Sequence, residues 1–369
     1  MSDDQIRGRV RAATATRDPR EWLHAATALA RAGRHDEAAH ALLRARSLGA
    51  ERGTIQPVRA QIAPNDITSF HVRGLFEGED PSGETLGGWS ADGRHLYLAG
   101  QGGTISVADV SGGARRQVAT LVECRVYALG ADLDGARLTL AGTFAGDRKT
   151  AIRILDLKSG ALGPPIGRGH RRVRGVTFID GTGLVGCTET RRARAFSVAS
   201  TDGRLTWSRS SEGAAMDREG SVALDDGRDV ATYALPEKSP RARIPVAGRR
   251  PTRSPYTVHV SGDTVLVLRV IGGSPVVTSV SGQEPVTVGL PPGPGDVMDL
   301  ALESSGRYVG VTWHDKRPLS KLDLVDLRSP GLTRTLELPG RPTALVWSPS
   351  GRRLAVGLER SGVAIVEAT

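Results

Sequence analysis

The segments WSADGRHL (residues 89–96) and WSPSGRRL (residues 347–354) decide the fold. Each joins a short β-like run to a second one through a tight turn in which glycine follows Asp or Ser. Glycine tolerates the left-handed backbone that such turns require, so the pattern is typical of two antiparallel strands. The segments stand near the two ends of a β-rich region, which indicates that one structural unit recurs between them.

Seven turns in which glycine stands next to Asp, Glu or Ser recur along the chain at similar spacing. Successive turns lie 39 to 46 residues apart, which is the period of four-stranded propeller blades. The turns are Asp92-Gly93, Asp134-Gly135, Asp180-Gly181, Glu219-Gly220, Gly262-Asp263, Ser305-Gly306 and Ser350-Gly351.

The last unit is one strand short. It contains β-like runs at 343–347, 353–357 and 363–366, and then reaches Thr369. The β-like segment Ser69–Phe76 is in the right place to supply the missing outer strand and close the ring, which would leave only short, protected sheet edges. The sequence therefore predicts a mainly β fold, a seven-bladed β-propeller, with six or eight blades as alternatives.

The local sequences resemble WD40-type propellers over residues 69–369. The two opening segments look like that family's strand–turn–strand unit, and the third runs end in Asp109, Asp156 or Asp326, where the family commonly has aspartate. The Trp-Asp dipeptide is absent, Gly-His occurs only at 169–170, and residues 213–290 match poorly. A more general propeller is the alternative.

The first sixty residues are helical in pattern. Asp18 precedes Pro19, a pairing typical of a helix N-terminus, and Ala and Leu recur at helical spacing on both sides of Gly33. Residues 19–52 resemble one tetratricopeptide repeat, although Ala50 stands near the expected proline, and a third helix is predicted at 55–62. A lone repeat cannot bury its apolar face, so we expect either a helical appendage packed on its own propeller or a groove that binds a partner. The predicted domains are a small N-terminal α-helical hairpin (1–64) and the propeller (65–369).

Composition restricts the class of protein. The chain has 369 residues, a net charge of +9 and 49 basic residues, of which 44 are Arg. An Arg bias of this size is typical of a GC-rich coding sequence, so the overall charge is weak evidence for nucleic-acid binding. No apolar run has the roughly 18–20 residues that cross a bilayer. We expect a cytoplasmic bacterial protein without membrane association.

The distribution of charge over the two faces of the ring is more informative. In a propeller the turns between strands one and two lie on one face, and the loops between strands two and three, with those between blades, lie on the other. The second face collects the basic loop residues, an arrangement that would steer an acidic partner to the central opening. The predicted partner-binding residues are Arg148, Arg168, His170, Arg171, Arg172, Arg191, Arg192, Arg194, Arg249, Arg250, Arg253, Lys316, Arg317, Arg341 and Arg360.

The sequence carries no recognisable catalytic motif. Nucleophile-elbow, Walker-loop and His-Glu-x-x-His patterns are absent, the eight histidines are scattered, and Cys124 and Cys187 lie in β-like runs typical of core positions. We therefore expect no enzyme activity, no cofactor and no metal.

The function predicted on these grounds is a non-catalytic scaffold or adaptor, a subunit of a larger complex, that binds an acidic segment of a protein partner. One alternative is a nucleic-acid-binding component of a defence or processing complex, because guanidinium groups also suit phosphate. The other is a propeller enzyme, lactonase-like or lyase-like, whose residues converge only in space.

Overall fold

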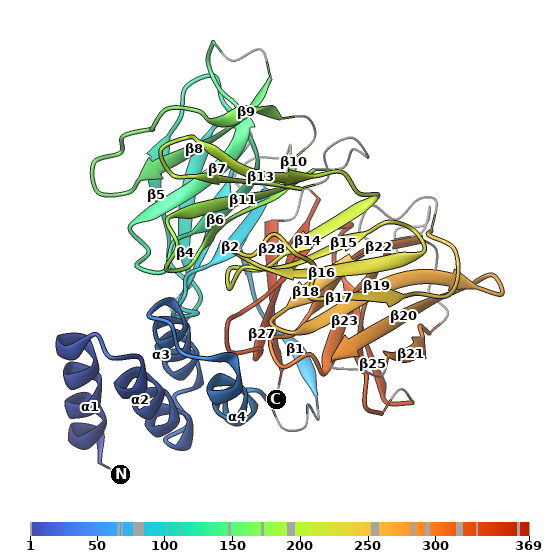
Figure 1. The fold of residues 1–369 in the computed structure, drawn as a ribbon, viewed down its shortest axis with the longest axis horizontal. Helices are drawn as coiled ribbons and strands as arrows, with labels where there is room; N and C mark the ends of the chain where they lie inside the picture. The colour runs from blue at the N-terminus through green and yellow to red at the C-terminus, as the bar shows by residue number, and fades with distance from the viewer. Residues whose placement is uncertain are drawn as a thin grey trace.

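The computed structural model shows seven four-stranded antiparallel sheets arranged as blades, with four helices at one end (Figure 1). The seven-bladed propeller predicted from the turn spacing is thus confirmed. The residues described are 2–64, 67, 69–76, 85–100, 102–111, 113–146, 149–170, 173–189, 196–251, 258–281, 285–291, 296–314, 320–329, 331–359 and 362–368.

Four helices precede the propeller. They are α1 (Asp3–Thr16), α2 (Pro19–Arg31), α3 (His35–Ser47) and α4 (Arg52–Ile62). As the sequence indicates, the Asp18 side chain caps α2 by accepting a hydrogen bond from the Arg20 backbone N–H. Helix α1 was not predicted, and it begins with a capping box between Ser2 and Gln5. None of these helices combines the length and the apolar character that a membrane-spanning helix needs.

The helices share one apolar core. Leu29, Leu42, Ala45 and Ile55 are buried among side chains of all four helices, including Ile6 of α1. The expected two-helix hairpin is therefore part of a four-helix unit, in which α1 covers an apolar surface that α2 would otherwise expose.

Blades 1 to 4 follow in chain order. Blade 1 consists of β2 (Thr85–Trp89), β3 (His95–Ala99), β4 (Thr104–Asp109) and β5 (Arg115–Thr120). Blade 2 consists of β6 (Arg125–Ala131), β7 (Arg137–Thr143), β8 (Thr150–Asp156) and β9 (Ile166–His170). Blade 3 consists of β10 (Val173–Ile179), β11 (Leu184–Glu189), β12 (Phe196–Ser200) and β13 (Leu205–Arg209). Blade 4 consists of β14 (Gly213–Met216), β15 (Ser221–Asp225), β16 (Asp229–Ala234) and β17 (Ala242–Pro245).

Blades 5 and 6 follow, and blade 7 closes the ring. Blade 5 consists of β18 (Val258–Ser261), β19 (Thr264–Ile271), β20 (Ser274–Ser281) and β21 (Pro285–Gly289). Blade 6 consists of β22 (Asp296–Leu302), β23 (Tyr308–His314), β24 (Ser320–Asp326) and β25 (Thr333–Leu338). Blade 7 consists of β26 (Pro342–Trp347), β27 (Arg353–Leu358), β28 (Gly362–Ala368) and β1 (Phe70–Phe76). Because β1 pairs antiparallel with β28, the strand predicted to complete the last blade does so.

The two tryptophans of the opening segments tie neighbouring blades together. The Trp89 Nε1–H donates to the Val346 carbonyl at 2.9 Å, and the Trp347 Nε1–H donates to the Ala301 carbonyl at 3.0 Å. These bonds link blade 1 to blade 7 and blade 7 to blade 6. An indole at the end of an inner strand therefore fills space between blades and also fixes their spacing.

The helices dock on the propeller end that carries the predicted turns (Figure 1). Ion pairs join Arg44 of α3 to Asp134, and Arg52 and Arg59 of α4 to Asp263 and Glu219. All three acids belong to the turns found in the sequence.

The first turn of α3 makes a further contact, because the Asp36 carboxylate lies 3.1 Å from the Arg353 guanidinium of blade 7. The helices therefore pack on their own propeller, one of the two arrangements that the sequence left open.

Candidate binding site in the central channel

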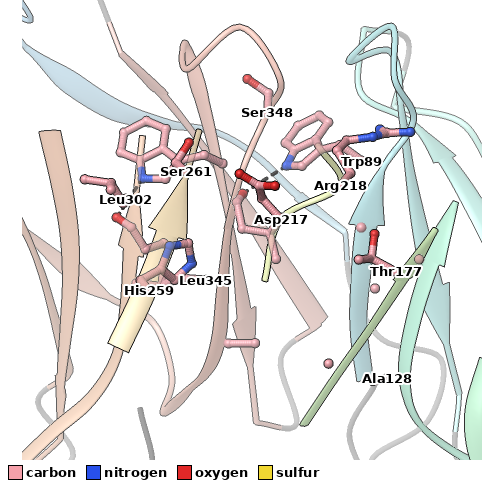
Figure 2. A pocket seen from close by; sticks show the side chains of 18 of the residues that line it. Trp89, Ala128, Thr177, Asp217, Arg218, His259, Ser261, Leu302, Leu345 and Ser348 are labelled. Atoms are coloured by element: carbon pink, nitrogen blue, oxygen red, sulfur yellow. Dashed lines mark hydrogen bonds between the residues drawn. The ribbon is translucent and has the colours of Figure 1, made fainter. Parts of the chain in front are cut away.

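A cavity of about 870 Å³ lies along the axis of the ring. Residues of all seven inner strands, β2, β6, β10, β14, β18, β22 and β26, line it, and Figure 2 shows side chains from several of them. Leu42, Leu43 and Ile62 of the docked helices line it as well. Helices α3 and α4 thus cover one end of the channel, here called the closed end.

Arginines mark the opposite end of the channel. Arg125 begins β6, Arg174 is the second residue of β10, and Arg341 directly precedes β26. Together with Glu359 they line the cavity, and Arg125, Arg341 and Glu359 are exposed to solvent. We call this end the mouth, and its four charged side chains carry a net positive charge.

Two of the mouth arginines, Arg125 and Arg341, are held loosely. The Arg125 guanidinium lies 5.6 Å from the centre of the Tyr127 ring, and the Arg341 guanidinium lies 3.5 Å from the Glu359 carboxylate. Both partners of the second pair are nearly half exposed, so the pair contributes little to stability.

Two carboxyl groups lie in the channel wall, Asp217 partly buried and Asp299 buried. Asp217 follows β14 at the closed end and accepts backbone N–H bonds from Ser221 at 2.9 Å and Gly262 at 2.7 Å. Burial, followed by the charge of Glu219, raises the pKa of Asp217 to about 7. The second bond crosses to blade 5, so this carboxyl group also links two blades.

Asp299 in β22 has a similar structural role. Its carboxyl oxygens accept from the backbone N–H groups of Leu300 and Leu345, both at 2.8 Å, and the second bond crosses to blade 7. Burial raises the pKa of Asp299 to about 7, and the positive charge of Arg174 opposes that shift.

His259 of β18 lines the same cavity. Burial lowers its pKa to about 4, so the imidazole is neutral at pH 7. Among the described residues, no group forms a hydrogen bond with its buried Nδ1 atom.

The structure describes few of the arginines predicted from the sequence to bind a partner. Arg341 lies at the mouth, Arg249 is exposed, and Arg250 pairs with Glu212 at 2.9 Å and Asp225 at 3.4 Å. Arg168 and His170 are residues of β9. The predicted residues Arg148, Arg171, Arg172, Arg191, Arg192, Arg194, Arg253, Lys316, Arg317 and Arg360 lie outside the described residues.

The channel residues of the inner strands were not predicted from the sequence, because the predicted binding residues were chosen from loops. Arg125, Arg174, Asp217, His259 and Asp299 are far apart in the chain and belong to five blades. A usable signal was present: each lies in, or next to, the β run that precedes a turn, where a charged or imidazole side chain interrupts an apolar strand.

The described residues show no metal centre, because no three His, Cys, Asp or Glu side chains gather there. Cys124 and Cys187 are buried, as predicted for core positions. Burial raises the pKa of the Cys187 thiol well above its usual value, which makes it a poor nucleophile.

Comparisons with known proteins support the fold and go no further. No family model and no curated protein matches the chain, whereas 1433 chains of solved structures resemble it. One of these is the hydrazine synthase of Kuenenia stuttgartiensis, with a TM-score of 0.59 and 13% sequence identity over 81% of this chain and 99% of that chain. At this identity the likeness establishes a shared propeller fold alone.

Proposed function

We propose that the chain is a non-catalytic interaction scaffold that holds an acidic segment of a partner protein at the mouth of the channel. The observation that carries this proposal is the position of the helices. They occupy the acidic turn end, so the basic end is the one through which a partner reaches the channel.

The chemistry of the mouth favours an acidic partner. Arg125, Arg174 and Arg341 belong to blades 2, 3 and 7. Among the described lining residues Glu359 is the acid at the mouth, and the charge of Arg174 also acts on Asp299. Guanidinium groups bind carboxylates through paired hydrogen bonds, and cations around a concave opening raise the local concentration of an anionic partner. The loop arginines predicted from the sequence would extend this contact, and other subunits of a complex would bind elsewhere on the ring.

Charge reversal at the mouth tests the proposal. We expect the triple variant Arg125→Glu, Arg174→Glu and Arg341→Glu to lose at least tenfold in affinity for a ten-residue glutamate-rich peptide, measured by fluorescence anisotropy. The matched control replaces Arg116, Arg243 and Arg328, which are exposed and do not line the channel, and it should bind the peptide like the unaltered chain. Equal losses in the two variants would show that net charge, rather than the mouth, attracts the peptide.

The same variants separate protein from nucleic acid as the partner. Complexes are captured on the tagged chain from its native cell extract, with and without nuclease. The proposal expects a stoichiometric protein that survives nuclease and is lost with the mouth variant. Capture that disappears with nuclease, together with a steep fall of affinity with salt for an oligonucleotide, would instead indicate a nucleic-acid-binding protein.

A further inference from the structure

The two ends of the channel differ in charge. At the closed end Glu219 pairs with Arg59, whereas Asp217 forms no salt bridge with any described residue. Arg218 pairs with Asp180 at 2.7 Å, and the charge of Arg46 also acts on Asp217. Among the described lining residues, Arg59 and Arg218 therefore balance Asp217 and Glu219 when Asp217 is ionised, whereas the mouth is positive.

Asp217 has acceptor capacity to spare. An ionised carboxylate offers about four lone-pair sites, and the two backbone N–H bonds to Asp217 occupy only two of them. The group lines the cavity (Figure 2). Burial of a carboxylate is costly, and Arg59 offsets this cost at Asp217 through its charge without forming a salt bridge. An ammonium group in contact with the carboxylate would offset it further.

A second polar group lies on the neighbouring blade. His259 precedes Ser261 by two positions on β18, so it lies nearer the mouth than the Gly262 N–H that Asp217 binds. Its buried Nδ1 atom has no partner among the described residues. A molecule bound in the channel with polar groups along its length would provide a hydrogen-bond partner for this atom.

The channel wall suits an extended polypeptide. Each of the seven inner strands is the edge of its sheet, and an edge strand presents a row of N–H and C=O groups that no neighbouring strand pairs. Small apolar side chains, such as those of Val126, Ala128 and Val260, also line the channel. Strand β6 has seven residues and at about 3.3 Å per residue spans about 23 Å, which is enough for an extended segment of about six residues.

We infer that the channel binds the amino-terminal end of the partner polypeptide. Its α-ammonium group lies against Asp217, small apolar residues fill the middle of the channel, and acidic residues that follow contact Arg125, Arg174 and Arg341. This inference rests on the proposed function, since it states which part of the acidic partner enters the site.

Matched peptides test the inference on the full-length chain. The probe has a free amino terminus, four small apolar residues and then four glutamates, with a fluorophore at its carboxyl end. We expect N-acetylation to weaken binding about tenfold, because a charge-assisted hydrogen bond is lost. A third peptide is acetylated and begins with lysine. It should bind as weakly as the acetylated probe, because its ammonium group is carried on a long side chain.

Substitution of Asp217 identifies the binding group. Asp217→Asn keeps the size of the side chain and an acceptor oxygen, and it should bind the free and acetylated peptides equally. Asp202→Asn removes the same charge from an exposed turn and should preserve the tenfold preference. The comparison of free and acetylated peptides on the unaltered chain is decisive even if Asp217→Asn does not fold.

The outcomes separate the two proposals. Equal binding of the free and acetylated peptides, sensitive to charge reversal at the mouth, would overturn the amino-terminal inference and leave the scaffold proposal standing. Tight binding of the lysine peptide would also overturn it, because the channel would then accept any ammonium group. No binding of any of the three would overturn both.

Discussion

The closed end and the mouth of the channel both contain arginines, but these have opposite environments. At the closed end Arg59 and Glu219 are each about 10% exposed and pair with each other. At the mouth Arg341 is 47% exposed beside a single glutamate. The same residue type thus attaches the helices at one end and stays accessible at the other, so the number of arginines in a region does not reveal their role.

The largest expected effect concerns the buried attachment of α4. We expect Arg59→Met to destabilise the chain by about 4 kcal/mol, because it leaves Glu219 buried beside Asp217 without its cation. Urea unfolding followed by circular dichroism measures the change.

Arg52→Met is the matched control, since the Asp263 partner of Arg52 is 44% exposed. Arg52 itself is 17% exposed and also donates to Ser221 at 2.8 Å, so its replacement should cost about 1 to 2 kcal/mol. Similar losses in the two variants would contradict the distinction between a pair with a buried acid and a pair with an exposed acid in the attachment of α4.

The next largest expected effect is the loss of stability on substitution of a glycine at the closed end. Gly181 has a φ of +73°, and an added Cβ atom would lie 2.3 Å from the Ser47 carbonyl oxygen at the end of α3. We expect Gly181→Ala to cost about 2 kcal/mol through backbone strain and the clash. Gly160 has a φ of +70° with nothing within 4 Å, so Gly160→Ala isolates the strain, at about 1 kcal/mol. Thermal unfolding that gave equal losses would argue against close docking of α3.

The last effect is a pH dependence that originates in the channel wall. Because the pKa of Asp299 is raised to about 7 in the folded chain, against about 4 when unfolded, the folded state binds more protons between these values. Stability should therefore fall as pH rises from 5 to 8, and one pKa unit corresponds to about 1.4 kcal/mol. Carboxyl groups with lowered pKa values, such as Asp326, titrate below pH 5 and do not affect this range.

Asp299→Asn should flatten that slope, which melting temperatures measured at pH 5 and pH 8 would show. An unchanged slope in this variant would assign the dependence to other buried acids, among them Asp217 and Glu303.

The ring could be predicted from the sequence because a propeller is built from local units. A turn such as Asp134-Gly135 and the strands beside it lie within about twenty residues, so each hairpin is visible in the sequence as a short pattern. Even the closing strand, which is remote in the chain, was predictable because the last blade was one strand short. Helix α1 was missed because its apolar residues are few, and only packing against α2 reveals why they are buried.

The sequence by itself predicted seven blades, with six or eight as alternatives, and it determined the turns and the excess of arginine. All of these depend on residue types and spacing along the chain. Only the tertiary structure decided which arginines are paired. Three arginines of the helices pair with acids roughly 90 to 210 residues away, namely Arg44, Arg52 and Arg59. Three others line the mouth of the channel although they are far apart in the chain, namely Arg125, Arg174 and Arg341. The interaction between two charges depends on their distance in space, and the closure of the ring and the docking of the helices set that distance.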